Sequence, residues 1–152
     1  ILMIIVYTRE KKLQHIKDYF DKNGIEYDEK KLDVADYFNT DNPGIVIDRK
    51  ANLQEVCNNL SNGKKNIHRF LNEVKRAKKN SIRFIVLVEG TSAKTLVDVK
   101  MWNSKYSNHT GQWLYQEMLR LFYAYKVEWM FCKKNETAER ILELLEYDKR
   151  RN

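Results

Sequence analysis

The sequence places three charged residues, Asp48, Arg49 and Lys50, directly after a short apolar run. The preceding residues, 45–47, are Ile-Val-Ile, a composition typical of a buried strand. Because side chains alternate along a strand, Asp48 and Lys50 should project from one face and Arg49 from the other. A carboxylate and an ammonium at the end of a buried strand are costly unless they pair or bind an ion. Two alternatives follow, a structural ion pair or an ion-binding site.

A second acid precedes this cluster in the chain. Asp36 lies in the segment Leu-Asp-Val-Ala-Asp-Tyr at 32–37, and eleven residues separate it from Asp48. Two carboxylates on neighbouring strands could hold Mg²⁺ or Mn²⁺, since both ions prefer oxygen ligands. Such an ion acidifies a bound water and neutralises charge that develops on a phosphate, and Lys50 could orient the water and stabilise the transition state. The spacing alone is weak evidence, because many unrelated proteins would match it.

The charge of the chain favours a polyanionic partner. The net charge is +7, and the isoelectric point is near 9.3. The excess is uneven, because residues 64–83 hold eight basic residues and one acid. A basic helix face is most often only solvated, but its position after the Asp48–Lys50 cluster favours phosphate binding. The residues predicted to contact nucleic acid are Lys64, Lys65, Arg69, Arg76, Lys78 and Lys79.

Length and composition exclude several other classes of protein. A chain of 152 residues with 43% hydrophobic content predicts a single domain over 1–152 that needs no disulfide or metal for stability. No apolar run is long enough to span a membrane, and residues 1–7 lack the flanks of a signal peptide. Cys57 and Cys132 lie inside apolar patterns, far apart in the chain, and because the sequence shows no secretory signal we expect a reduced, cytoplasmic protein. The three histidines lack the spacing of a zinc site.

Hydrophobic patterns predict the elements that would position these side chains. Segment 25–38 should form strands or a hairpin, 39–44 a turn with the only proline, and 91–109 a polar, partly ordered loop. Gly24 should end the first helix. Alternation of strands and helices predicts an α/β fold with helices on both faces of a sheet. Other strands are expected at 3–7, 45–49, 82–90 and 127–132, and helices at 11–23, 53–60, 67–79, 110–125 and from an N-cap at Asn135 to about 149.

Five short blocks in order resemble the XPF/Hef-type nuclease domain of the PD-(D/E)xK superfamily. That family's blocks run roughly V-D-x-R-E, L-x-V-G-D-Y, V-E-R-K-x-x-x-D-L, R-F-x-x-Q-x-x-R-L and L-L-V-E-G. The resemblance continues into 127–145 and leaves out only 91–109. It implies a central mixed β-sheet flanked by helices in a three-layer, restriction-endonuclease-like core. The blocks here are VYTRE (6–10), LDVADY (32–37), VIDRKANLQEV (46–56), RFLNEVKRA (69–77) and IVLVEG (85–90).

The resemblance also implies roles for individual residues. Asp36 and Asp48 match the metal-binding acids, and Lys50 matches the catalytic lysine. Glu10 and Glu89 could instead be buried partners of an arginine, Arg9 or Arg49, and this alternative stays open. Three residues match polar active-site positions that help to organise metal and phosphate: Arg9, Glu10 and Arg49. Three more match supporting positions: Glu73, Arg76 and Glu89.

The chain departs from the family pattern at four places. Tyr7 and Gln54 stand where the family has Asp, although Glu55 follows Gln54. Ala35 replaces a glycine, which is a mild change if the backbone there is ordinary. Asp48 replaces Glu and shortens the reach to a metal by one methylene. The metal pair and the lysine survive, so activity is expected, while the number of metal ions and the turnover stay open.

Three functional hypotheses follow from these residues. The first is a Mg²⁺- or Mn²⁺-dependent DNA endonuclease that selects fork, flap or junction DNA, although that selectivity rests on the resemblance alone and RNA stays open. The second is a catalytically inactive DNA-binding or scaffold subunit, motivated by Tyr7 and Gln54. The third is a basic α/β domain whose charged strand end is structural.

The resemblance also bears on architecture and assembly. Relatives of this type carry a tandem helix-hairpin-helix module, which this sequence lacks, so the chain resembles the stand-alone nuclease domains of phages and mobile elements. A homodimer, if formed, would then use the domain's own surface. The aromatic-rich segment 110–125 is more readily explained by core packing than by an interface.

Overall fold

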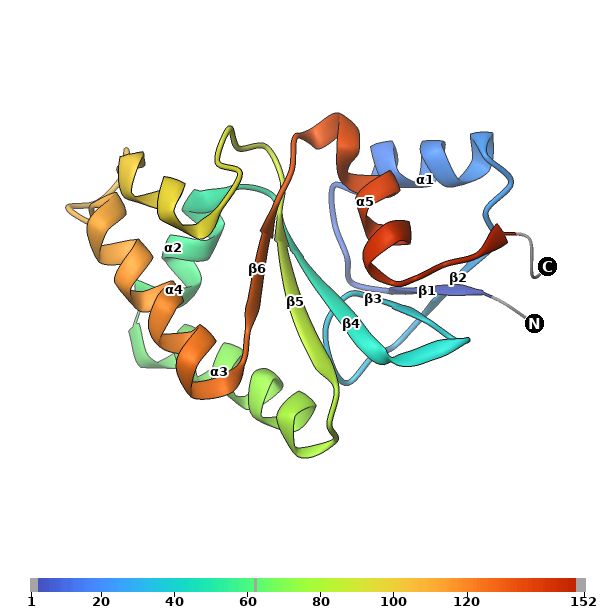
Figure 1. Cartoon of the computed structure of the whole chain (residues 1–152), viewed down its shortest axis with the longest axis horizontal. Helices are drawn as coiled ribbons and strands as arrows, with labels where there is room; N and C mark the ends of the chain where they lie inside the picture. The colour runs from blue at the N-terminus through green and yellow to red at the C-terminus, as the bar shows by residue number, and fades with distance from the viewer. Residues whose placement is uncertain (1–2, 62, 150–152) are drawn as a thin grey trace.

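Six strands form one mixed sheet in the computed structural model, which describes residues 3–61 and 63–149, the side chains of 63 and 64 excepted (Figure 1). The order across the sheet is β2-β1-β3-β4-β5-β6. Strand β1 pairs with β2 in parallel and with β3 antiparallel, β3 and β4 are antiparallel, and β4, β5 and β6 are parallel. The strands are β1 Ile4–Tyr7, β2 Tyr27–Lys30, β3 Tyr37–Asn39, β4 Asn42–Lys50, β5 Arg83–Val88 and β6 Glu128–Phe131.

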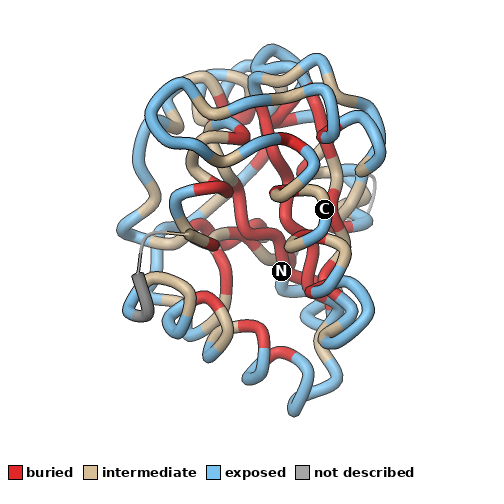
Figure 2. The backbone as a smooth tube through the Cα atoms, turned by 90° about the vertical axis from the view of Figure 1, so that its left-hand side faces the viewer, coloured by how far each residue is buried: buried red, intermediate tan, exposed pale blue. Residues whose placement is uncertain are grey.

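Helices cover both faces of this sheet, as the sequence predicts (Figure 1). On one face, Val46 and Val86 pack against α2, α3 and α4, while on the other Ile47 and Ile85 pack against α1 and α5. These alternating residues explain the two cores, because neighbours on a strand point to opposite faces. Buried residues therefore follow the strands through the centre of the molecule (Figure 2). The helices are α1 Gln14–Lys22, α2 Leu53–Ser61, α3 Gly63–Lys79, α4 Gly111–Tyr125 and α5 Thr137–Leu144, with 3₁₀ helices η1 Leu96–Met101 and η2 Lys134–Glu136.

Several element boundaries differ from those expected. Segment 25–38 is not a hairpin, because β2 and β3 lie on opposite sides of β1. Strand β4 begins at Asn42, inside the expected 39–44 turn, because β3 and β4 are joined through a tight connection at 40–41. Gly24 has a φ of +66° and ends the first helix as predicted.

Two later segments also differ. Asn135 does not cap the last helix, since it lies within η2, and α5 ends at Leu144, with Glu146 in the left-handed region (φ 57°). The segment 91–109 contains η1, whose Val99 is fully buried. Two turns of 3₁₀ helix, six residues in all, are too short to produce a recognisable hydrophobic period, which explains why a loop was expected there.

The parallel strands bring several strand ends to one edge of the sheet. Lys50 pairs in register with Val88, and Val88 with Phe131, so the carboxyl ends of β4, β5 and β6 are adjacent. The end of α3 and the start of β5 lie at the opposite edge (Figure 1). None of the helices in the described ranges combines the length and the apolar character that a membrane crossing requires.

Candidate active site

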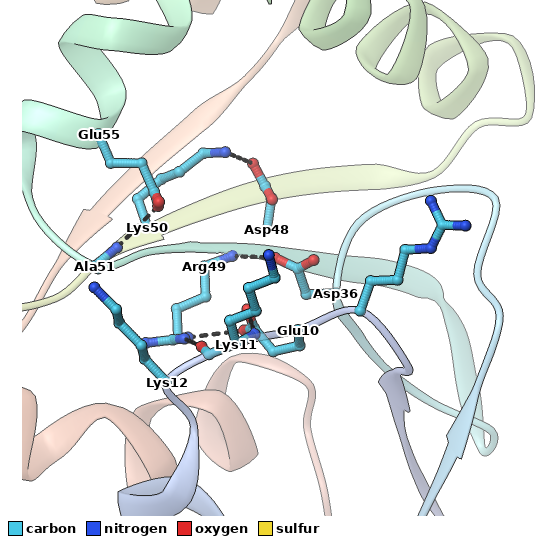
Figure 3. A pocket seen from close by; sticks show the side chains of 10 residues that line it. Glu10, Lys11, Lys12, Asp36, Asp48, Arg49, Lys50, Ala51 and Glu55 are labelled. Atoms are coloured by element: carbon cyan, nitrogen blue, oxygen red, sulfur yellow. Dashed lines mark hydrogen bonds and ion pairs between the residues drawn. The ribbon is translucent and has the colours of Figure 1, made fainter.

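Asp48 and Lys50 lie side by side at the carboxyl end of β4. The Nζ atom of Lys50 is 3.1 Å from Oδ2 of Asp48, as the strand period predicts (Figure 3). Asp48 is buried, with 6% of its surface exposed. Lys50 forms an ion pair with Oδ2, but among the described residues no donor has the angles of a hydrogen bond to this oxygen. This buried oxygen therefore keeps unused capacity to accept a bond or bind a cation.

Asp36 brings the second carboxylate to the same place. Its Oδ2 accepts the backbone N–H of Arg49 at 2.9 Å, and its own N–H donates to the Ile47 carbonyl at 2.9 Å. Burial raises the pKa of Asp36 well above its ordinary value, and the negative charges of Asp48 and Glu10 raise it further. Two carboxylates that repel each other in this way form a site whose energy a bound cation would lower.

The donor set fits a divalent cation that retains part of its water shell. No group of three or more His, Cys, Asp or Glu side chains within the described residues could hold a metal ion together. Mg²⁺ is commonly held by one or two carboxylates, with water and substrate phosphate as the other ligands. The Asp36–Asp48 pair, with the free acceptor on Asp48, meets that requirement.

The pair opens into a cleft of about 390 Å³. Sequence reasoning gave no site role to four residues of its wall, Lys11, Lys12, Ala51 and Glu55, although it noted Glu55 beside Gln54. Glu55, and not Gln54, faces the cleft, and it accepts the Ala51 N–H at 3.1 Å. The adjacent lysines at 11 and 12, directly after the VYTRE block, were the signal for a basic wall. The complete lining is Arg9, Glu10, Lys11, Lys12, Asp36, Asp48, Arg49, Lys50, Ala51 and Glu55 (Figure 3).

Lys50 is held in its charged form. Burial by itself lowers the pKa of Lys50, but the charges of Asp48, Glu55 and Asp36 outweigh burial, and the net direction is upward. An ammonium cannot act as a general base. Lys50 can therefore donate hydrogen bonds and stabilise negative charge next to Asp48.

Arg49 points to the other face of β4 and is enclosed by acceptors. Its Nε donates to Glu10 Oε2 at 2.8 Å, Nη1 donates to Glu89, and Nη2 donates to the Lys11 carbonyl. Glu89 is 3% exposed and also contacts His15 Nε2 at 2.8 Å. Of the two roles left open for Glu10 and Glu89, this geometry supports burial against an arginine. Arg49 positions the 10–12 segment beside the cleft.

Helix α3 holds the loop that carries Asp36. Glu73 accepts the N–H of Ala35, and Arg76 Nη2 donates to the Asp33 carbonyl at 2.9 Å. Both residues were expected to support the site from behind. Ala35 has a φ of +61°, so the backbone at the family's glycine position is left-handed, and the expectation of a mild change there does not apply.

This torsion leads to a stability prediction for Ala35. Relief of the left-handed strain should offset the loss of one buried methyl, so Ala35→Gly should leave the free energy of unfolding unchanged or raise it by up to about 1 kcal/mol. Ala77→Gly, inside α3, should lower it by about 1 kcal/mol or more. Urea unfolding of both variants provides the measurement. Equal destabilisation by the two changes would contradict the prediction.

None of the predicted nucleic-acid residues whose side chains the structure describes lines the cleft. Lys65 and Arg69 are exposed on the first half of α3, and the side chain of Lys64 lies outside the described residues. Lys78 donates to the Ala124 carbonyl at 3.2 Å and, with Lys79, lies at the end of α3, at the edge of the sheet opposite the cleft. Arg9 is exposed and lines the cleft itself.

Comparison with known proteins identifies the family. The ERCC4 domain model matches residues 6–144. The chain belongs to the ERCC4 domain family. This is the nuclease-domain family to which the five blocks point, and the resemblance to XPF-type nucleases is confirmed. A search of curated proteins found no match.

Solved structures confirm the fold of this ERCC4 domain. XPF from Aeropyrum pernix superimposes with a TM-score of 0.71 at 21% identity, over 98% of this chain and 66% of that one. The structure of XPF from Aeropyrum pernix in complex with DNA gives a TM-score of 0.70 at 18% identity, over 99% of this chain and 66% of that one. The ERCC4 domain described here therefore spans just under two thirds of the length of these chains.

Proposed function

We propose that this ERCC4 domain is a divalent-metal-dependent DNA endonuclease that hydrolyses phosphodiester bonds in branched DNA such as forks, flaps or junctions. The observation that carries the proposal is the pair of facing carboxylates, Asp36 and Asp48, with the Lys50 ammonium 3.1 Å from Asp48 in a cleft with a basic wall. Family membership supports nuclease chemistry. The structural likeness to an XPF in complex with DNA supports DNA as the partner.

Five residues of the cleft have a role in this proposal. Asp36 and Asp48 would hold Mg²⁺ or Mn²⁺, which supplies an acidified water and neutralises charge on the scissile phosphate. Lys50 would hydrogen-bond a phosphate oxygen and stabilise the charge that develops on it. The exposed cations Lys11 and Lys12 would contact the sugar-phosphate backbone and set its position.

A cleavage assay tests the proposal. Labelled fork, flap, four-way and linear duplex DNA, with matched RNA substrates, are incubated with the protein in Mg²⁺, Mn²⁺ or EDTA. We expect cleavage with Mg²⁺ or Mn²⁺ that is fastest on branched DNA, and none in EDTA. Folded protein that cuts no DNA with either ion would reject the enzyme, and equal rates on linear and branched DNA would reject the selectivity.

A second candidate is a DNA-binding subunit without activity. Tyr7 and Gln54 favour it, because they stand at two positions where the family pattern has an acid. Calorimetry separates the two candidates. The enzyme should release or absorb heat as Mn²⁺ binds, and Asp48→Asn should remove that signal, whereas an inactive subunit need not bind Mn²⁺ at all.

The raised pKa of Asp36 predicts how metal binding depends on pH. A cation requires the ionised carboxylate, and Asp36 holds its proton to higher pH than an ordinary Asp because of burial and the charge of Asp48. Mn²⁺ affinity and cleavage should therefore decline as the pH falls from neutral to mildly acidic values, before ordinary aspartates titrate near 3.9. Mn²⁺ titrations at several pH values measure this. Affinity that is constant down to about pH 4 would contradict it.

A further inference from the structure

A second hollow lies beside the cleft. It has a volume of about 250 Å³, and its wall includes Asn52, Trp102, Asn103, Lys105 and Tyr106. We refer to it as the aromatic groove. Ala51 lines the cleft and the next residue, Asn52, lines the groove, so the two hollows adjoin at the end of β4. The groove is therefore within reach of a nucleic-acid strand that leaves the cleft past Asn52.

The segment 91–109, which lies between the family's sequence blocks, supplies five of the nine residues that line the groove. Ser104 Oγ donates to Gln54 Oε1 at 3.0 Å, so this segment is joined to the start of α2 (Figure 1). Ser104 Oγ also accepts the backbone N–H groups of Tyr106 and Ser107, both at 3.1 Å. Tyr106 is 83% exposed on this hydrogen-bonded turn. An ordered turn thus presents a large aromatic side chain to solvent.

The chemistry of the groove differs from that of the cleft. Among its described lining residues, Lys105 is the single charged side chain, and the others include two aromatic rings and three amides. The oxygen of Asn52 accepts the Glu55 N–H at 2.8 Å, and that of Asn103 accepts the Gly111 N–H at 3.4 Å. In the described part of the chain their amide nitrogens make no such bond and can donate to a ligand.

Aromatic rings and amide donors suit a nucleobase better than a phosphate. Single-stranded nucleic acid is commonly bound by stacking of its bases on aromatic side chains, and base edges are read by amides. The groove is slightly smaller than pockets for drug-sized ligands, which occupy about 300–1,000 Å³. Its size therefore favours one base over a larger ligand.

We propose that the aromatic groove holds one unpaired nucleotide of the DNA substrate, whose base stacks on Tyr106 and contacts Trp102. Lys105 would pair with the adjoining phosphate. This subsite adds a binding position for the DNA substrate to the proposed function, and it rests on that function for the identification of DNA as the partner. It gives the enzyme a physical means to prefer DNA that has an unpaired segment beside the cut.

Binding in EDTA tests this subsite without any need for catalysis. A fluorescent single-stranded oligonucleotide is compared with an abasic one of equal length and charge. Stacking of one base should make the intact strand bind about 5- to 150-fold more tightly. Tyr106→Ala should remove that preference and leave abasic binding unchanged, while Tyr106→Phe should retain it. Tyr123→Ala, at a tyrosine that is 76% exposed on α4, is the matched control and should retain it.

Equal affinity for intact and abasic strands, or a preference that survives Tyr106→Ala, would overturn the subsite. A fluorescence measurement provides a second test of base stacking on Tyr106. The fluorescence of 2-aminopurine in the strand should be quenched by the unmodified protein and by Tyr106→Phe, and not by Tyr106→Ala. Base preference without cleavage would reject the nuclease and keep the subsite, and cleavage without base preference would do the reverse.

Discussion

Asp36→Asn should abolish cleavage and at the same time stabilise the metal-free protein. Under the proposed function Asp36 is one of two carboxylates that hold the metal ion, so its loss should lower the rate by about 10³-fold or more. The raised pKa of Asp36 means that the folded state binds its proton more tightly than the unfolded chain does. Its contribution to stability is therefore complete below the unfolded pKa and is lost as the pH rises through the folded pKa.

At neutral pH, Asp36→Asn should avoid the loss of folding stability that ionisation of Asp36 causes. Asparagine carries no charge, and its side-chain oxygen can still accept the Arg49 N–H. Each unit of raised pKa corresponds to about 1.4 kcal/mol, and each kcal/mol to a rise in Tm of about 2–4 °C. Cleavage assays and thermal unfolding in EDTA measure the two effects. Asp18→Asn, on the exposed face of α1, should change neither. Retained cleavage, or a variant that unfolds more easily, would contradict the prediction and favour a structural role for the acid.

Arg49→Met should cause a large loss of stability. The substitution leaves Glu10 and Glu89 buried without their cation, and Glu89 is only 3% exposed. Removal of one partner from a buried ion pair typically costs about 3–5 kcal/mol. We therefore expect the Tm to fall by about 10 °C, measured by calorimetry or circular dichroism.

Two controls identify the cause of that loss. Arg83→Met breaks an exposed pair in which Arg83 Nε donates to Glu128 at 2.6 Å, and it should cost about 1 kcal/mol or less because solvent screens the charges. Arg49→Met combined with Glu10→Gln and Glu89→Gln should recover most of the loss, since no buried charge is left unpaired. Equal destabilisation by Arg49→Met and Arg83→Met would show that Arg49 is not the centre of a buried ion network.

The structure explains two of the departures from the family pattern. Gln54 turns away from the cleft and bonds Ser104 beside the aromatic groove, while Glu55 takes a place in the wall of the cleft. Ala35 keeps the left-handed backbone that a glycine would adopt more easily, because Glu73 accepts its N–H. The positions of Gln54, Glu55 and Ala35 depend on how α2 and α3 pack beside the strand ends. The spacing of residues within the sequence blocks does not reveal that packing.

The alternation of side chains along β4 was predictable, because it depends only on the backbone of a strand. It placed Asp48 beside Lys50, turned Arg49 to the other face, and divided Val46 and Ile47 between two cores. Similarly, the alternation of apolar strands and helices was enough to predict a layered α/β fold. These properties arise within a few consecutive residues, so a sequence pattern can record them.

Only the tertiary structure decided which distant groups meet. Arg49 contacts Glu10 and Glu89, which lie 39 and 40 positions away in the chain. Lys78 lies in the last turn of α3, at the end of the helix that is far from the cleft. Such contacts depend on strand order and on the helices packed over each face, and the left-handed torsion at Ala35 depends on its tertiary hydrogen bond. Local sequence periodicity carries no information about these long-range contacts. The sequence therefore specified the chemical groups of the site, while tertiary packing specified which groups contact one another.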